Sequence, residues 1–345
     1  MVKKIIHSAL IGLVCAGLIL FVLPRFTQQG QLNFFDKIVS FSDAVRVASP
    51  AVVNVYNRSF SSTNNSTDSL DVNSLGSGVI MSKDGYILTN KHVVQGADQI
   101  VVALQNGRIY EANLVGSDKL TDLAVLKINA DHLSTIPQNP DRQVHVGDIA
   151  LAIGNPYNLG QSVSQGIISA TGRNAVGDSV GRQDFIQTDA SINRGNSGGA
   201  LINSAGELVG ISTLSIGKDS NEIAEGLNFA IPISIANDVM QKIIRDGRVI
   251  RGYFGVQSNI LFNNGEQSEN NQGVLISSVS DNGPAAKAGV QAGDIVLKFN
   301  GVVAESPAQM IQVISNIKPN TQVNVLISRL GKQINIPVTI EEYPN

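Results

Sequence analysis

Between residues 51 and 231, apolar and polar residues alternate in short runs, which is the pattern of half-buried β-strands. Turn sequences separate the runs, and two of them, Lys83-Asp84-Gly85 and Asn106-Gly107, are strong hairpin signals. Short strands at hairpin spacing predict a mainly β fold, an antiparallel double β-barrel. The predicted strands are 51–56, 78–81, 86–89, 100–105, 109–115, 123–128, 149–153, 162–170, 185–188, 200–203, 208–213 and 227–231.

The pattern changes after residue 231. Ile235, Val239 and Ile243 recur at helical spacing, Ser234 is a candidate N-cap and Gly247 a candidate helix end. This helix marks a domain boundary, after which one copy of a smaller module follows. The segments predicted in the module are 253–256, 273–279, 285–289, 295–299, a helix at 307–317, and strands 322–328 and 333–339; a further short helix is predicted earlier, at 42–48.

The N-terminal segment carries Lys3 and Lys4 before an apolar run from Ile5 to Leu23. A helix over these nineteen residues is about 28 Å long, close to the roughly 30 Å of a bilayer's hydrocarbon core. A cleaved signal peptide is the alternative, but the run lacks an Ala-x-Ala-like cleavage site. We therefore expect residues 1–27 to be a cytoplasmic N-terminus with an uncleaved transmembrane anchor, followed by a connector at 28–41 and a body outside the membrane.

Composition narrows the function classes. Hydrophobic residues make up 43% and charged residues 15% of the chain, with 33 glycines and no tryptophan, which favours compact, turn-rich β structure. A net charge of −3 gives no support for nucleic-acid binding. The one cysteine, Cys15, lies in the first apolar run, so we expect no disulfide framework in the folded part. No His/Cys/carboxylate cluster has ligand spacing, and we expect no metal and no cofactor.

Three residue types that acyl transfer needs occur in order at strand ends or in loops: His92, Asp122 and Ser197. Ser197 would attack a carbonyl, His92 would take and return its proton, and Asp122 would orient the imidazole. The glycine-flanked turn of Ser197, with Gly195 and Asn196, would form the oxyanion hole from backbone N–H groups.

Each of these residues alone also has an ordinary structural interpretation: a surface histidine, a solvated carboxylate, a polar turn. Asp118 is a nearby alternative to the predicted aspartate. The other histidines, His7, His132 and His145, lie in no matching pattern. Only the three types in this order make the catalytic interpretation the better one.

In this context the three motifs resemble the chymotrypsin-like serine proteases of the HtrA (Deg) family, over a domain at residues 42–248. The smaller module, residues 249–345, resembles a PDZ domain, on the segments Arg251–Val256, Val279–Gly289 and Ala292–Gly301. The resemblance extends from about Phe41 to Tyr343, and it implies a serine endopeptidase.

The PDZ resemblance implies that an extended C-terminal peptide adds a strand to the module and that its carboxylate is received by the loop of Tyr253, Phe254, Gly255 and Val256. The helix at 307–317 would close the groove. Three of its residues could point inward, and the sequence does not distinguish among them: Met310, Ile311 and Ile314.

The family resemblance also assigns residues around the nucleophile. Ile211, Ser212, Thr213 and Leu214 would border the substrate pocket, and their apolar character favours a small aliphatic residue before the scissile bond. Two further residues fall at positions that the resemblance links to activation: Arg173 and Tyr157.

Within the family, the anchor, the short loop Ser61–Ser69 and the single PDZ module are typical of membrane-anchored envelope-stress sensors of the bacterial inner membrane. The resemblance then implies activation by C-termini of misfolded outer-membrane proteins and cleavage of an anti-sigma factor (RseA-like) in the periplasm, which starts the sigma-E response. It also implies a homotrimer, to which Phe34, Phe35 and Phe41 could contribute. The alternatives are a catalytically silent PDZ adaptor or chaperone, and a broad periplasmic quality-control protease.

Overall fold

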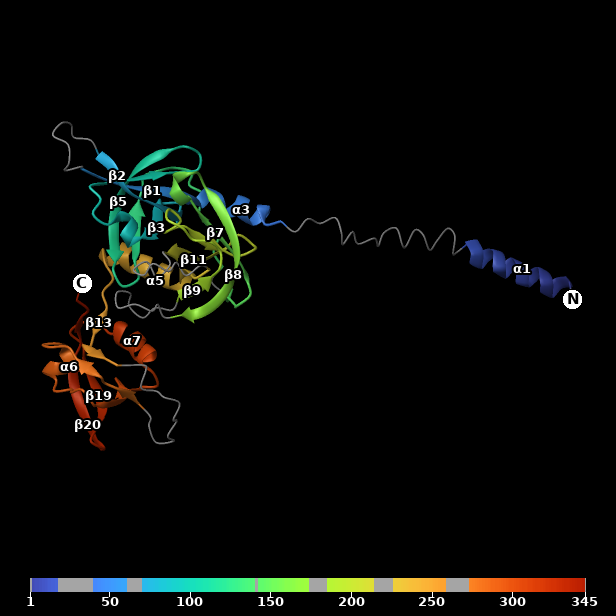
Figure 1. Ribbon diagram of the computed structural model, residues 1–345. Helices are drawn as coiled ribbons and strands as arrows, with labels where there is room; N and C mark the ends of the chain where they lie inside the picture. Colours follow the sequence, from blue (N-terminus) through green and yellow to red (C-terminus); the bar gives the residue numbers. More distant parts are fainter. Residues whose placement is uncertain are drawn as a thin grey trace. The chain divides into compact units, whose positions relative to one another are not determined.

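A computed structural model describes residues 2–17, 40–60, 70–139, 142–173, 185–213, 226–258 and 273–344 (Figure 1). The N-terminal part contains helix α1 (Val2–Gly17). Within the described ranges no helix has both the length and the apolar character to cross a membrane. Residues 18–23, which complete the predicted span, lie outside those ranges, as do the connector at 28–39 and the predicted trimer residues Phe34 and Phe35.

Two closed antiparallel barrels form the larger domain, as the alternating pattern predicts. The first barrel has the strand order β1-β2-β3-β6-β5-β4 and the second β10-β11-β12-β9-β8-β7 (Figure 1, blue to teal and green to gold). The first contains β1 (Val52–Phe60), β2 (Leu70–Ile80), β3 (Tyr86–Asn90), β4 (Gln99–Ala103), β5 (Ile109–Asp118) and β6 (Leu123–Lys127). The second contains β7 (Ile149–Gly154), β8 (Ser162–Arg173), β9 (Phe185–Thr188), β10 (Ala200–Ile202), β11 (Leu208–Thr213) and β12 (Asn228–Pro232).

The barrel interiors account for the apolar positions of the pattern, because every second side chain of a strand points inward. Val55, Val79 and Leu88 fill the first barrel without solvent exposure, and Ala152 and Leu201 lie in the core of the second.

The hairpin of β1 and β2 is longer than the sequence predicts: β1 continues to Phe60 and β2 starts at Leu70 instead of residue 78. In the added part of β2, Val72 and Asn73 are exposed and only Gly76 and Ser77 are buried, so this segment does not show the regular burial that marks a core strand. Its backbone pairing with β1 makes it a strand nevertheless.

Two short helices precede β1, α3 (Ser42–Ala48) and η2 (Ser49–Ala51), and two lie between strands, α4 (Lys91–Val94) after β3 and η3 (Pro156–Asn158) after β7. The predicted long helix is α5 (Ile233–Asp246), which contacts β5, β6 and β11. Its end agrees with the prediction, since Gly247 is left-handed (φ 73°) and its N–H binds the Ile243 carbonyl. The start of α5 differs from the prediction, because Pro232 is the N-cap residue, without a side-chain cap, and Ser234 is inside the helix.

The smaller module follows α5 (Figure 1, orange to red). Its main sheet has the order β15-β17-β19-β20, with β18 paired to β17, and two short pairs join β13 to β21 and β14 to β16. Phe254, Phe299 and Val325 lie in its buried core. Its elements are β13 (Gly252–Tyr253), β14 (Val256–Gln257), β15 (Val274–Leu275), β16 (Ser278–Val279), α6 (Pro284–Lys287), β17 (Ile295–Phe299), β18 (Val302–Val303), α7 (Pro307–Ser315), β19 (Gln322–Arg329), β20 (Lys332–Thr339) and β21 (Glu341–Glu342).

A buried ion pair fastens the segment after α5 to the end of β5. Arg251 donates through both terminal nitrogens to the carboxylate of Asp118, at 2.6 and 2.9 Å, and the two side chains are only 16% and 7% exposed. Thr121 adds two hydrogen bonds to the same carboxylate. Burial alone would raise the pKa of Asp118, but the hydrogen bonds and charge of Arg251, with the bonds from Thr121, hold that pKa below its ordinary value of 3.8.

We expect Arg251→Ala to lower the free energy of unfolding by about 3 kcal/mol, because it leaves a buried carboxylate without its counter-charge. Arg142→Ala is the control, since its ion pair with Glu207 is half exposed and should contribute less than about 1 kcal/mol. Urea unfolding of the full chain measures both. Equal losses in the two variants would contradict the assignment.

The pH dependence has a definite sign. The pKa of Asp118 is lower in the folded than in the unfolded chain. The ionised carboxylate therefore stabilises the fold fully at pH values above its ordinary pKa of 3.8, and this stabilisation is lost as the pH falls through the lower pKa of the folded chain. The difference in stability between the native chain and Asp118→Asn should therefore shrink below that pH.

Candidate active site

His92 and Asp122 are in direct contact in the first barrel. The Nδ1 atom of His92 lies 2.5 Å from Oδ2 of Asp122, and the His92 backbone N–H donates to Oδ1 at 3.0 Å. An ionised carboxylate only accepts hydrogen bonds, so this contact places the imidazole proton on Nδ1 and leaves Nε2 as the basic nitrogen. Both side chains are 31% exposed, so the imidazole is held on one side and open on the other.

The backbone around this pair explains how it is held. The Asp122 carbonyl accepts hydrogen bonds from the Lys91 N–H at 2.8 Å and from the Asn90 side-chain amide at 3.0 Å. Asp122 is itself left-handed (φ 54°), which turns its carboxylate toward the start of α4. The end of β3 and the turn before β6 are thereby locked together.

Ser197 lies in a turn that is held from both barrels. Its carbonyl accepts a hydrogen bond from the Ser77 N–H of β2 at 2.8 Å. On the other side the Gly198 N–H donates to the Ser212 carbonyl of β11 at 2.8 Å, and the Ser212 N–H donates to the Gly199 carbonyl at 2.9 Å. The nucleophile candidate is therefore fixed where the two barrels meet.

The glycines of this turn are required by space as well as by conformation. Gly195 and Gly198 have φ values of 102° and 82°, in the left-handed half of the map. A Cβ on Gly198 would lie 2.2 Å from the Ser77 carbonyl oxygen, and one on Gly195 would lie 2.3 Å from that of Asn155. Any larger residue at these positions must displace the backbone that holds Ser197.

The same turn presents backbone donors. Within the part of the chain that the structure describes, the N–H groups of Gly195 and Ser197 form no hydrogen bond, although both residues are buried. Buried N–H groups are nearly always paired, so two free ones beside a serine form an anion-binding arrangement. The Asn196 N–H differs, because it donates to the Asn193 carbonyl at 2.9 Å.

The turn also lies against α4. A Cβ on Gly76 would meet the Val93 side chain at 2.6 Å and the Ser197 carbonyl oxygen at 3.1 Å, so the His92 helix and the Ser197 turn share one neighbour. No hydrogen bond joins the side chains of His92 and Ser197 among the described residues. Catalytic hydrogen bonds are often long without substrate, and this geometry does not exclude the pair.

The residues predicted to border the substrate pocket follow directly. Ile211, Ser212 and Thr213 are buried in β11, beside the Ser197 turn, and the Ser212 hydroxyl has no hydrogen-bond partner among the described residues. Leu214 lies outside the described residues.

Of the residues linked to activation, Tyr157 lies in η3 with a left-handed backbone (φ 54°), and its N–H binds the Arg194 carbonyl at 3.1 Å. Arg173 is the last residue of β8, and its backbone pairs with that of Phe185. The structure describes the backbone of Arg173 but not its side chain. The link of Arg173 and Tyr157 to activation therefore stays a prediction.

In the smaller module, the predicted carboxylate loop is built on a rigid base. Phe254 is buried and packs edge-on against Phe299, with ring centres 5.0 Å apart, and its carbonyl accepts from the Ala285 N–H at 2.9 Å. Tyr253 packs edge-on against Tyr343 at 5.4 Å. Of the three helix residues left open by the sequence, Met310 and Ile314 are buried in the module core and Ile311 is exposed.

Among the described residues, only one edge of this loop is paired with another strand. The carbonyls of Gly255 and Gln257 accept hydrogen bonds from the N–H groups of Ser280 and Ser277, on the β16 side. Val256 lies between them, so its own N–H and carbonyl point to the opposite edge. A peptide strand could pair there.

The remaining candidates are engaged elsewhere. Asp118, the alternative to Asp122, is occupied by Arg251 and Thr121. His145 faces Asp148 at 3.9 Å on the surface, and His132 lies in a connection with a left-handed backbone. Among the described residues no group of three or more His, Cys, Asp or Glu could hold a metal ion.

Ser77 is the supporting residue that the sequence did not single out. It is fully buried, and its hydroxyl donates to the Gly195 carbonyl at 2.7 Å and accepts from the Asn155 N–H at 3.1 Å. The available signal in the sequence was a small polar residue between two glycines, directly before the apolar residues Val79 and Ile80.

Comparison with known families identifies both modules. A trypsin-like peptidase domain matches residues 76–211, and a PDZ domain matches residues 255–340. These matches confirm a chymotrypsin-like domain followed by one PDZ domain.

Individual relatives cover the whole chain. The serine endoprotease DegS of Haemophilus influenzae is 71% identical, across 100% of this chain and 99% of its own. DegS of Escherichia coli (strain K12) is 50% identical, with the same coverage of both chains.

Solved structures agree. A serine endoprotease from Yersinia pestis has 52% identity and a TM-score of 0.74, over 89% of this chain and 99% of that one. The HtrA-type protease AlgW with a decapeptide has 40% identity and a TM-score of 0.79, over 89% of this chain and 100% of that one. The chain belongs to the HtrA-type serine endoproteases, among the relatives named DegS.

Proposed function

We propose that His92, Asp122 and Ser197 are the catalytic triad of this endoprotease. The contact of 2.5 Å between His92 and Asp122, beside a serine turn with two free N–H groups, is the observation that supports this assignment most directly. Ser197 Oγ attacks the scissile carbonyl while Nε2 of His92 takes its proton. The same proton then goes to the leaving amine, and water releases the acyl group by the reverse roles.

The N–H groups of Gly195 and Ser197 receive the oxyanion of the tetrahedral intermediate. These N–H groups need no reorganisation when the oxyanion forms, because hydrogen bonds from Ser77 already hold the carbonyls of Gly195 and Ser197. Asn196 contributes to the shape of the hole through its position between them.

Ser197→Ala should lower the rate of peptide-bond cleavage by at least about 10⁴-fold, because it removes the attacking oxygen. Gly195→Ala should lower kcat by about 10²-fold or more, since its Cβ displaces one oxyanion donor. Gly147→Ala is the matched control: Gly147 is also left-handed (φ 94°) but its Cβ would meet no atom within 4 Å. Steady-state cleavage assays measure all three, and an active Ser197→Ala chain would refute the triad.

The second part of the proposal is that the PDZ domain senses C-terminal peptides. The open edge at Val256 supports an added strand, and the adjoining loop Tyr253–Val256 supports capture of the terminal carboxylate. The similar structure of the HtrA-type protease AlgW is one with a decapeptide, which agrees with a peptide ligand for this family. The ligands we propose are exposed C-termini of misfolded outer-membrane proteins.

Binding of such a peptide to the PDZ domain then shifts the protease toward its active state, because the peptide has a higher affinity for the active than for the inactive state. Arg173 and Tyr157 are the proposed intermediaries. Tyr157 supports this role through its direct backbone bond to Arg194, next to the oxyanion turn.

A peptide with a free C-terminal carboxylate should stimulate cleavage, and its C-terminally amidated form should stimulate much less, because the amide lacks the charge that the loop receives. Peptide titration against cleavage of an anti-sigma periplasmic domain measures the difference. Equal stimulation by the two forms would contradict carboxylate recognition while leaving the triad assignment intact.

The third part concerns location and substrate. We propose a single-pass anchor in residues 1–27 of a bacterial inner membrane, a cytoplasmic N-terminus, and protease and PDZ domains in the periplasm. The apolar run Ile5–Leu23 after Lys3 and Lys4 supports it. The proposed substrate is a membrane-spanning, RseA-like anti-sigma factor, whose cleavage starts the sigma-E response, and the proposed assembly is a homotrimer.

The full chain should fractionate with membranes and resist extraction by carbonate, because about nineteen apolar residues in a bilayer are effectively irreversibly inserted. Replacing Leu13 and Leu18 by Lys is the test, with Leu330→Lys, an exposed residue of the PDZ domain, as control. A soluble full-length chain would contradict the anchor. Cleavage of many unrelated envelope proteins in a substrate survey would instead favour broad quality control.

A further inference from the structure

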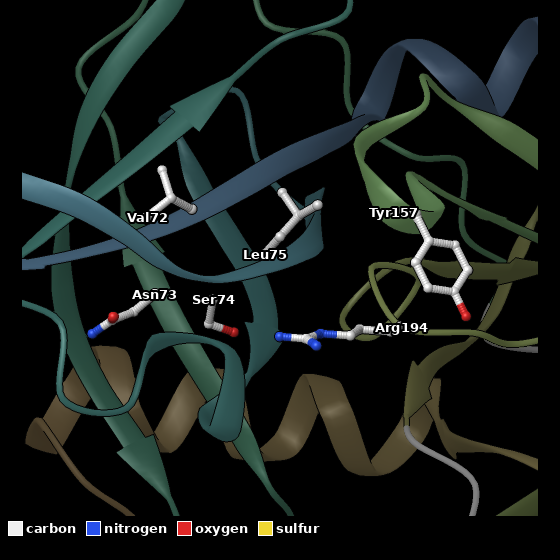
Figure 2. A pocket seen from close by; sticks show the side chains of 6 residues that line it. All are labelled: Val72, Asn73, Ser74, Leu75, Tyr157 and Arg194. Atoms are coloured by element: carbon white, nitrogen blue, oxygen red, sulfur yellow. The ribbon is translucent and has the colours of Figure 1, made fainter.

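A cavity of about 250 Å³ lies beside the Ser197 turn and has no role in the mechanism above. Figure 2 shows its lining, with the Arg194 side chain reaching from its loop toward Ser74 of β2 and Tyr157 on the other side. The lining residues are Val72, Asn73, Ser74, Leu75, Tyr157 and Arg194.

The position of the cavity relative to the nucleophile can be fixed from backbone bonds. Ser197 lies between β11, which binds the backbone of Gly198, and β2, whose Ser77 binds the Ser197 carbonyl. The acyl part of a substrate extends along β11, where the proposed pocket for the residue before the scissile bond lies. The part of the substrate that follows the scissile bond therefore runs past β2, and the cavity lies on the β2 side of Ser197.

In the described ranges, no strand pairs with the edge of β2 along this path. Its other edge pairs with β1, and β3 pairs with β2 only at Val79 and Ile80. The Ser77 N–H and carbonyl point away from β1, toward Ser197 and Thr89. In a strand alternate residues point the same way, so the backbone of Leu75 faces the open edge. An extended substrate can pair with Leu75, about two residues beyond the bond that Ser197 attacks.

The charge of the cavity comes from one group. Arg194 is exposed, and its guanidinium forms no hydrogen bond or ion pair with any residue of the described ranges. No carboxylate is among the lining residues, and Asn73 and Ser74 offer neutral polar groups. An unpaired guanidinium recognises a carboxylate by two parallel hydrogen bonds.

We propose that this cavity is the subsite for the second residue after the scissile bond and that Arg194 makes it prefer Asp or Glu. The inference rests on the proposed triad and adds a specificity-determining residue to it. The protein substrate would then carry an acidic residue two positions beyond its cleavage site.

Internally quenched peptides that differ only at this position, with Asp, Glu, Ala or Lys, test the proposal on the full-length chain in detergent with activating peptide. We expect kcat/KM for Asp and Glu to exceed that for Lys by about fivefold to tenfold at low salt, since the site is partly exposed, and the ratio to fall as NaCl is raised. Arg194→Gln should reduce the ratio to within about twofold, and Arg194→Glu should invert it. Lys83→Gln, which removes an exposed positive charge from another turn of the first barrel, should leave the ratio unchanged.

Two negative results have different meanings. If the Ala peptide is cleaved in a Ser197-dependent way but Asp and Lys peptides react equally, the subsite proposal is wrong and the triad stands. The same holds if the preference survives in Arg194→Gln. If no peptide is cleaved in a Ser197-dependent way, the triad and the subsite both fail.

Discussion

The structure depends on the close packing of one turn, residues 194–199, between two β-barrels. Ser77 of β2 binds its backbone from one side, and Ser212 of β11 binds it from the other. The Ser77 carbonyl oxygen would lie 2.2 Å from a Cβ on Gly198, and the Asn155 carbonyl oxygen 2.3 Å from a Cβ on Gly195, which is too close for either side chain. Only glycine permits both this approach and the left-handed backbone, so the turn has one conformation that satisfies its neighbours.

That constraint explains why two donors are left free. The Gly195 N–H shares its peptide unit with the Arg194 carbonyl, which accepts from the Tyr157 N–H, and the Ser197 N–H shares its unit with the Asn196 carbonyl, which accepts from the Gly199 N–H. These bonds fix the orientation of both units, and the two N–H groups have no partner in the described structure. Leaving buried donors unpaired costs stability, and proteins tolerate it at functional sites. The serine is thus surrounded by a field suited to negative charge before any substrate arrives.

A second constraint acts on the aspartate side. Asp118 ends β5 and Asp122 directly precedes β6, and the two carboxylates have different partners. Asp118 neutralises Arg251 in a buried pair, and Asp122 is left to hold His92. The segment that enters the PDZ domain is therefore bonded to the end of β5, four residues before the aspartate that holds His92.

The sequence by itself determined the barrels, the helix after them and which residues are candidates for the reaction. Strand alternation depends only on which side chains avoid water, and Gly195, Ser197 and Gly198 needed no partners to be recognised. It missed the polar half of β2, Ser77 and Arg194, because their importance comes from backbone pairing and from neighbours more than a hundred residues away. Likewise, the sequence favoured Asp122 but kept Asp118 as an alternative, since two carboxylates four residues apart look alike. Only the tertiary structure distinguishes their surroundings, because folding places a guanidinium beside Asp118 and an imidazole beside Asp122.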